Sequence, residues 1–178
     1  MQGRGTFVAN NKVKQTLTAT KGGYSEQLQL QGKTPKIKVL HLTVVPANLL
    51  LQDIFRLNEN DPVNKLERIR YADDLPLQYE IAYLPWRETP GLQKEECEKS
   101  LYSLLKSQFD IEILKTEENL QIILADEKIA KMLETHVGTP CFQIETFAYN
   151  KNGNIIEYSK AFFHGKRASF VIERNYHE

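Results

Sequence analysis

The stretch that most constrains the fold is LERIRYADDLPLQYEIAYLP, residues 66–85, which predicts a β-hairpin. Two runs rich in Ile, Leu and Tyr flank Asp73-Asp74, a dipeptide typical of turns. The first run carries Arg68 and Arg70, whose side chains project from one face of the strand because side chains alternate along it. Two guanidinium groups that face an interior repel each other, so they require an anion between them.

The residue opposite Arg68 depends on the length of the turn. A two-residue loop places Arg68 opposite Tyr79. A three-residue loop places it opposite Glu80, and places Arg70 opposite Gln78. The second register gathers two cations, a carboxylate and an amide on one face, as a pocket for an anionic small molecule requires. The sequence does not choose between the registers, and a solvated sheet face with a cross-strand ion pair fits the same spacing.

Length and composition indicate one globular domain, or one domain with a tail. The chain has 178 residues, of which 41% are hydrophobic and 26% charged. The net charge is zero, so the chain as a whole has no electrostatic attraction to nucleic acid or to a membrane surface. Residues 1–40, however, hold seven Lys or Arg and a single acidic residue, Glu26.

The cysteines and histidines indicate a cytoplasmic protein without a metal site or cofactor. Cys97 and Cys141 form no CxxC motif, which favours a reduced compartment. The four histidines lack the spacing of metal ligands. We find no run long enough to span a membrane, no signal peptide, no GxGxxG and no P-loop.

The order of expected elements predicts an α+β fold with an antiparallel sheet and flanking helices, because hairpins alternate with helices. In residues 1–23 only Thr6–Val8 resembles a strand, and this polar, glycine-containing stretch has the composition of a linker. The remaining expected elements are helices at 24–31, 47–55, 94–109 (in two pieces) and 127–135, the hairpin at 66–85, and strands at 36–45, 111–125, 141–149, 154–164 and 169–173.

Two helix starts carry side chains that suit an anion. Ser25 lies near the first, and Ser100 is expected to cap another whose first turn holds Tyr102. Caps without any ligand are more common than ligand sites, and that interpretation stays open for both. On the strand at 154–164, Glu157 shares a face with Phe163.

Several of these stretches, taken in order, resemble a known family. RGTFV at residues 4–8 resembles the end of the β-wing in the winged helix-turn-helix of GntR-type bacterial transcription regulators. The hairpin, SLY at residues 100–102 and NGNIIEYSKAFFHGKR at residues 152–167 resemble the effector-binding (UTRA) domain of the HutC subfamily. The resemblance extends from Arg4 to Arg174, and the ordered set of motifs is more specific than any one of them.

The resemblance implies a fold similar to chorismate lyase, a homodimer, and no enzymatic activity. It also implies that a DNA-reading winged helix normally precedes RGTFV, so that operator DNA is bound through a part absent from this chain. On this basis residues 1–23 are the linker and wing remnant, and residues 24–178 are the UTRA domain.

Within that family, the regulators of N-acetylglucosamine use bind amino-sugar phosphates. Resemblance to them implies a phosphate site and an adjoining sugar site. The phosphate positions match Ser25, Arg68, Arg70, Ser100 and Tyr102. The sugar positions match Glu80 and Glu157, but a tyrosine of the family is replaced here by Phe163 and the arginine after it by His164. One lost hydroxyl can change which sugar is preferred.

Three hypotheses follow for the function. The resemblance favours a repressor that senses a hexose or amino-sugar phosphate. A regulator that senses a carboxylate metabolite is the second, and an enzyme of the chorismate lyase type is the third. The wing-like RGTFV has no role in such an enzyme, and the chain shows no evident nucleophile and base.

We predict a homodimer in solution, because each half of a regulator must reach one half-site of its operator. Light scattering at high micromolar protein should give twice the chain mass of 20.6 kDa. A monomer at that concentration would contradict the prediction.

Overall fold

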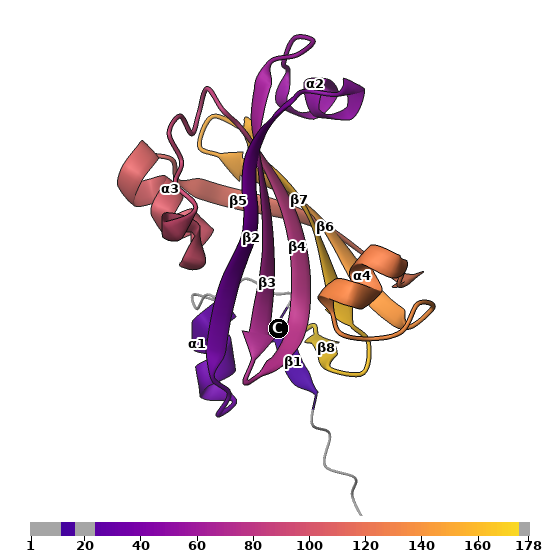
Figure 1. The fold of residues 1–178 in the computed structure, drawn as a ribbon. Coiled ribbons are helices and arrows are strands. Elements are labelled where there is room, and N and C mark those ends of the chain that lie inside the picture. Colours follow the sequence, from indigo (N-terminus) through magenta and orange to yellow (C-terminus); the bar gives the residue numbers. More distant parts are fainter. Residues whose placement is uncertain (1–11, 17–23, 175–178) are drawn as a thin grey trace, which may run out of the picture.

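An antiparallel sheet forms the body of the domain in the computed structural model, which describes residues 12–16 and 24–174 (Figure 1). The strands are β1 (Val13–Thr16), β2 (Pro35–Pro46), β3 (Pro62–Ala72), β4 (Leu75–Pro85), β5 (Ile113–Leu124), β6 (Pro140–Asn150), β7 (Ile155–His164) and β8 (Ala168–Val171). The helices are α1 (Tyr24–Leu30), α2 (Leu49–Phe55), α3 (Leu101–Phe109), α4 (Glu127–Met132) and the 3-10 turn η1 (Glu95–Glu98). No described helix has both the length and the apolar character needed to cross a membrane.

Six strands pair in the order β2-β3-β4-β7-β6-β5, and all of these pairs are antiparallel. The predicted α+β fold with an antiparallel sheet is therefore confirmed. The sequence analysis missed β1, which pairs in parallel with β8 in a separate two-stranded sheet. The strand-like Thr6–Val8 lies outside the described residues.

The β3–β4 hairpin places Arg68 opposite Glu80 and Arg70 opposite Gln78. Neither expected loop alone produces this register. The turn has two residues, with Ala72 paired to Leu75, and an irregularity in the pairing beyond Arg70 then shifts β4 by one residue. A bulge of this kind inserts one unpaired residue and changes the register beyond it. The register expected from a three-residue loop is thus reached by a shorter turn followed by a bulge.

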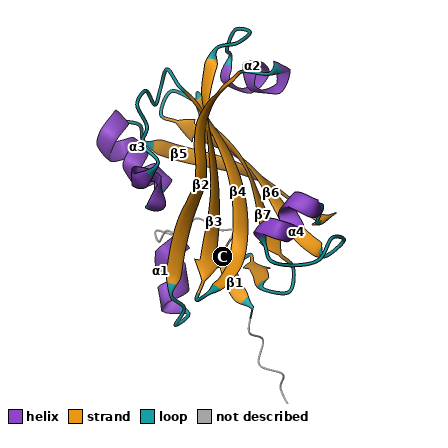
Figure 2. Cartoon of the chain, viewed as in Figure 1, coloured by secondary structure: helices purple, strands orange, loops and turns teal. Residues whose placement is uncertain are grey.

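Helices cover both faces of the sheet (Figure 2). The turn η1 and α3 pack on one face through Cys97, Leu101 and Leu105, and α1 packs beside them through Leu28. On the other face α4 packs around Tyr79 and Phe162, and α2 around Tyr158. Arg68 and Glu80 belong to the face covered by α1 and α3, and this face is called the site face below.

Glu67 is the buried charge of the opposite face. Its carboxylate binds Lys65 Nζ (2.8 Å), the Tyr79 hydroxyl (2.6 Å) and Lys128 Nζ of α4 (3.0 Å). Burial alone would raise the pKa of Glu67, but these three partners outweigh burial and lower the pKa to about 2. The network therefore ties α4 to the centre of the sheet only while Glu67 is ionised.

We predict that Glu67→Gln lowers the free energy of unfolding at pH 7 by on the order of 2 kcal/mol. Because the folded pKa lies below the usual 4.5, the stabilisation is complete above about pH 5 and is lost as the pH falls toward 2. Urea unfolding of parent and variant at several pH values checks this. Equal midpoints at pH 7, or a difference that does not shrink in acid, would contradict it.

Candidate functional site

Arg68 is the most deeply buried charged group of the site face, with 1% of its side chain exposed. Its Nε donates to Glu80 Oε2 (2.9 Å), and its Nη2 donates to the same oxygen. Its Nη1 donates to the main-chain carbonyls of Cys97 (3.2 Å) and Lys99 (3.4 Å). Arg68 thus joins the β3–β4 hairpin to the segment between η1 and α3, and most of its donors are occupied.

Arg70, two residues further along β3, is less completely bound. Its Nη2 lies 3.6 Å from Glu80 Oε1, and its guanidinium carbon lies 5.0 Å from the centre of the Tyr24 ring, at the start of α1. The Tyr24 hydroxyl donates to the carbonyl of Tyr71 (2.9 Å), which fixes the ring in this position. The Nε atom of Arg70 is buried and has no hydrogen-bond partner among the described residues. Arg70 is therefore a cation with an unused donor.

Two glutamates of the site face have opposite electrostatic behaviour. Burial favours the neutral form of Glu80, but the charges of Arg68 and Arg70 outweigh burial and lower its pKa. Glu157 on β7 is also buried, and burial together with the charge of Glu80 raises its pKa to about 7. Its Oε2 atom has no hydrogen-bond partner among the described residues. Glu157 therefore has one buried carboxylate oxygen without a donor, although its carboxylate interacts with the Tyr102 phenol.

The start of α3 adds Ser100 and Tyr102 to the same region. Ser100 is the N-cap, as predicted, and its side chain accepts from the main-chain amide of Ser103 (3.4 Å). Tyr102 keeps 38% of its surface exposed, and burial of the rest together with the nearby charge of Glu157 raises the pKa of its phenol. The phenol therefore stays protonated and can donate.

Ser25 and Phe163 are the remaining predicted site residues. Ser25 is exposed in the first turn of α1, next to Tyr24. Phe163 lies opposite Gln78, so it shares the row of Arg70 on the site face. It is buried among apolar side chains, with its ring edge-on to Phe170 at 5.1 Å between centres. Phe163 therefore contributes an apolar wall where a tyrosine would offer a hydroxyl.

The sequence analysis missed Tyr24 and the carbonyls of Cys97 and Lys99 as partners of the arginines. An aromatic residue beside Ser25 was a usable signal, since arginine stacks on aromatic faces. The carbonyls left no signal, because main-chain acceptors are present at every residue.

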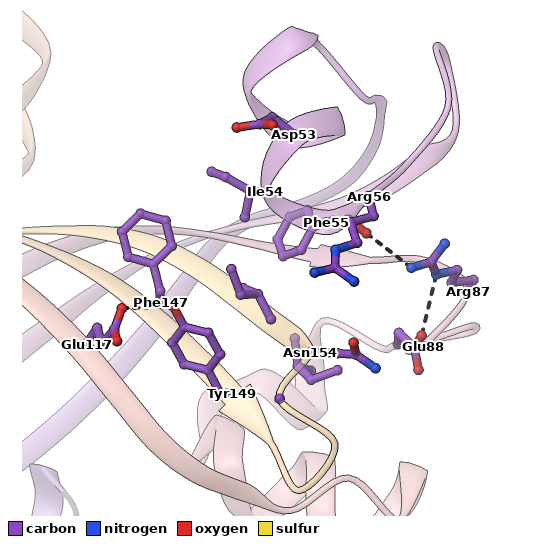
Figure 3. A pocket seen from close by; sticks show the side chains of 13 residues that line it. Asp53, Ile54, Phe55, Arg56, Arg87, Glu88, Glu117, Phe147, Tyr149 and Asn154 are labelled. Carbon is purple, nitrogen blue, oxygen red and sulfur yellow. Dashed lines mark hydrogen bonds and ion pairs between the residues drawn. The ribbon is translucent and has the colours of Figure 1, made fainter.

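A separate cavity of about 460 Å³ lies at the end of α2 (Figure 3). Figure 3 shows Phe147 and Tyr149 on one side of it and Arg56 and Arg87 on the other. Arg87 is engaged by the carbonyl of Phe55 (3.1 Å) and by Glu88 (3.4 Å). The residues that line it include none of the predicted site residues: Asp53, Ile54, Phe55, Arg56, Arg87, Glu88, Glu117, Phe147, Tyr149, Gly153, Asn154, Ile155 and Ile156.

Known proteins resemble the chain over nearly its whole length. It is 32% identical over 176 residues to YurK of Bacillus subtilis (strain 168), an uncharacterized HTH-type transcriptional regulator, covering 98% of this chain and 72% of that protein. It is 29% identical to a probable fructoselysine utilization operon transcriptional repressor of Escherichia coli (strain K12), covering 99% of this chain and 72% of that protein.

A solved structure has the same fold. The crystal structure of the effector domain of PhnF from Mycobacterium smegmatis matches with a TM-score of 0.82 at 24% identity, covering 92% of this chain and all of that one. The family model described as the UTRA domain matches residues 30–169. Because the relatives are named transcriptional regulators and repressors, the domain is not an enzyme. The chain belongs to the UTRA domain family of GntR-type transcription regulators.

Proposed function

We propose that this domain senses a phosphorylated sugar, a hexose or amino-sugar phosphate, and thereby controls DNA binding by a transcriptional repressor. Regulators of this family bind small-molecule effectors and operator DNA. The observation that carries the proposal is the pair of unused buried atoms, Arg70 Nε and Glu157 Oε2. Buried polar atoms normally have partners, so a free donor and a free acceptor on one face indicate a ligand that supplies both.

Arg70 is the group that attracts the anion in this proposal. A guanidinium binds phosphate through charge-assisted hydrogen bonds. The Nε of Arg70 has no hydrogen-bond partner among the described residues, so it can donate to a phosphate oxygen. In this proposal Ser25 in the first turn of α1, and Ser100 and Tyr102 at the start of α3, add neutral donors, as the family resemblance implies. Arg68 acts differently, because Glu80 and two carbonyls already occupy it. Its charge still adds to the positive potential around Arg70.

Glu157 and Glu80 bind the sugar in this proposal. A sugar hydroxyl can donate to the unused Oε2 of Glu157. Phe163 provides an apolar wall at the other end of β7, in the row of Arg70. One relative is named for fructoselysine utilization, a compound that contains a sugar, and this supports a sugar-derived effector. A carboxylate metabolite is the second candidate, because Glu80 shows that these arginines accept a carboxylate.

Control of DNA binding requires that the effector favour one state of the dimer over the other. In this proposal the homodimer joins two effector domains, and effector binding changes the spacing of the two DNA-binding domains. In this proposal residues 1–23 include the connection to those domains and residues 24–178 form the sensor, to which Val13–Thr16 are added by their pairing with β8.

We predict that glucose 6-phosphate or glucosamine 6-phosphate binds, whereas the unphosphorylated sugars do not. Arg70→Ala should weaken binding by about tenfold to 150-fold, because it removes charge-assisted hydrogen bonds. Calorimetry measures both effects, with Arg87→Ala as a control that lies outside the site. Equal affinity for free and phosphorylated sugars, or an Arg70→Ala variant that binds like the parent, would refute the phosphate assignment. Binding of carboxylates alone would favour the second candidate.

We predict that the two arginines differ in their effect on stability. Arg68→Met leaves Glu80 buried without its main partner and should cost about 3–5 kcal/mol of unfolding free energy. Arg70→Met removes only a longer and partly exposed ion pair and should cost about 1 kcal/mol or less. Urea unfolding compares the two variants directly. Equal losses would show that Arg70 is as much a part of the scaffold as Arg68.

A further inference from the structure

The cavity at the end of α2 has an apolar half that the fold leaves partly uncovered. Four half-buried side chains line this half: Ile54, Phe147, Tyr149 and Ile155. The Phe147 ring packs against the Tyr158 ring with 5.2 Å between their centres, which connects the cavity to the apolar cluster under α2. The volume of about 460 Å³ lies in the range of small-molecule sites, so this half can bury the body of a ligand.

The cation of the cavity is Arg56, the residue at which α2 ends. Its backbone is fixed in the left-handed conformation (φ 52°), and its amide donates to the carbonyl of Gln52. Its side chain is exposed and forms no hydrogen bond or ion pair within the described residues. Figure 3 shows the guanidinium across the cavity from Phe147 and Tyr149. Arg56 therefore presents an unpaired positive charge to the cavity.

The second arginine of the cavity, Arg87, is already occupied. Its Nη2 donates to the carbonyl of Phe55 (3.1 Å), and its Nε lies 3.4 Å from Glu88. The last carbonyls of a helix lack helical partners, so Arg87 stabilises the end of α2. Glu88 offsets its charge, and the charge that remains at this end of the cavity is that of Arg56.

Two further acids line the cavity, but neither is directed at Arg56. Glu117 binds Lys115 Nζ and the Tyr149 hydroxyl on the opposite side of the cavity. Figure 3 shows the carboxylate of Asp53 pointing away from Arg56. The surroundings of Arg56 thus keep one net positive charge. A single charge suits a monoanion better than a phosphomonoester, which carries about −1.5 to −2 near neutral pH.

Asn154 adds a neutral donor on the same side of the cavity as Arg56 (Figure 3). Its side chain forms no hydrogen bond within the described residues. The turn that carries it is fixed, because Asn150 Oδ1 accepts from the amides of Asn152 and Asn154, both at 3.0 Å. A carboxylate can accept hydrogen bonds from a guanidinium and an amide together, so this end of the cavity has the donors that a carboxylate requires.

We propose that this cavity binds a small monocarboxylate with an apolar or aromatic body, as a second ligand site apart from the site face. Arg56 and Asn154 donate to the carboxylate, and the apolar half contacts the body. Phe147 points to the face of the sheet opposite Glu157, because the next residue of β6, Ala148, is the one paired with Glu157. The two sites can therefore be occupied at the same time.

The test compares 3-phenylpropionate with two partial probes, 3-phenylpropanol, which lacks the carboxylate, and acetate, which lacks the apolar body. Hexanoate serves as a second complete probe with an aliphatic body. We expect NMR titration to show saturable shifts of the Asn154 side-chain amide and of the Ile54 and Ile155 methyl groups with both complete probes, with a Kd of about a millimolar or below. Each partial probe should bind about tenfold more weakly or worse, because it forms only part of the contacts.

Arg56→Gly removes the guanidinium without endangering the fold. Glycine is favoured in the left-handed conformation, so the urea midpoint should stay the same or rise. Binding of 3-phenylpropionate should weaken by about tenfold or more. Lys151→Gln is the matched control, because it also removes one positive charge, from the exposed turn before Asn154, without lining the cavity. This control should keep the affinity of the parent.

Each contrary result would overturn a stated part of the proposal. If neither complete probe shifts these resonances at about 10 mM, the cavity is not a site for this class of ligand. If the alcohol binds as tightly as the acid, or if Arg56→Gly keeps the affinity of the parent, the assignment of the carboxylate is wrong. An equal loss in Lys151→Gln would indicate general attraction rather than a site. Loss of binding in Arg70→Ala but not in Arg56→Gly would place the carboxylate on the site face.

Discussion

The buried ion pair between Arg68 and Glu80 is the interaction on which the site depends. Removing two charges from water is costly, and a pair of this kind persists only where further hydrogen bonds satisfy its remaining atoms. Arg68 meets that condition with the carbonyls of Cys97 and Lys99. One guanidinium therefore fixes the register of the β3–β4 hairpin and also sets how η1 and α3 approach the sheet.

The consequence of this pairing is that the rest of the site remains unsatisfied. Glu80 pairs with Arg68 and attracts Arg70, and in the part of the chain that the structure describes Glu157 forms no ion pair. Partly satisfied polar groups in a low-dielectric interior destabilise a fold, and natural sequences retain them chiefly where function requires them. Apolar residues are buried on both sides of the polar groups, around Leu28 and around Leu105. Their burial offsets the cost of the unsatisfied polar groups.

The sequence predicted most elements because they follow from local patterns. The alternation of apolar and polar residues identified β2 and the two hairpins. A serine before an apolar run identified the helix cap at Ser100. The hairpin register was left open, because a bulge after Arg70 rather than the turn length decides it. Strand β1 was missed, because its four residues become a strand only by pairing with β8, which is distant in sequence. Contacts such as Tyr24 with Arg70 depend on how α1 packs, and no local pattern specifies that.

Two consecutive residues of β3 make this arrangement difficult to shift. Glu67 points to the opposite face and binds Lys65, Tyr79 and Lys128, while Arg68 points to the site face. A slip of one residue would exchange the faces of every side chain on the strand. Glu67 would then face the site in place of Arg68, and Arg68 would enter the apolar cluster around α4. Both charge networks would break together, so the two faces fix one register jointly, and the position of Arg70 beside α1 follows from it.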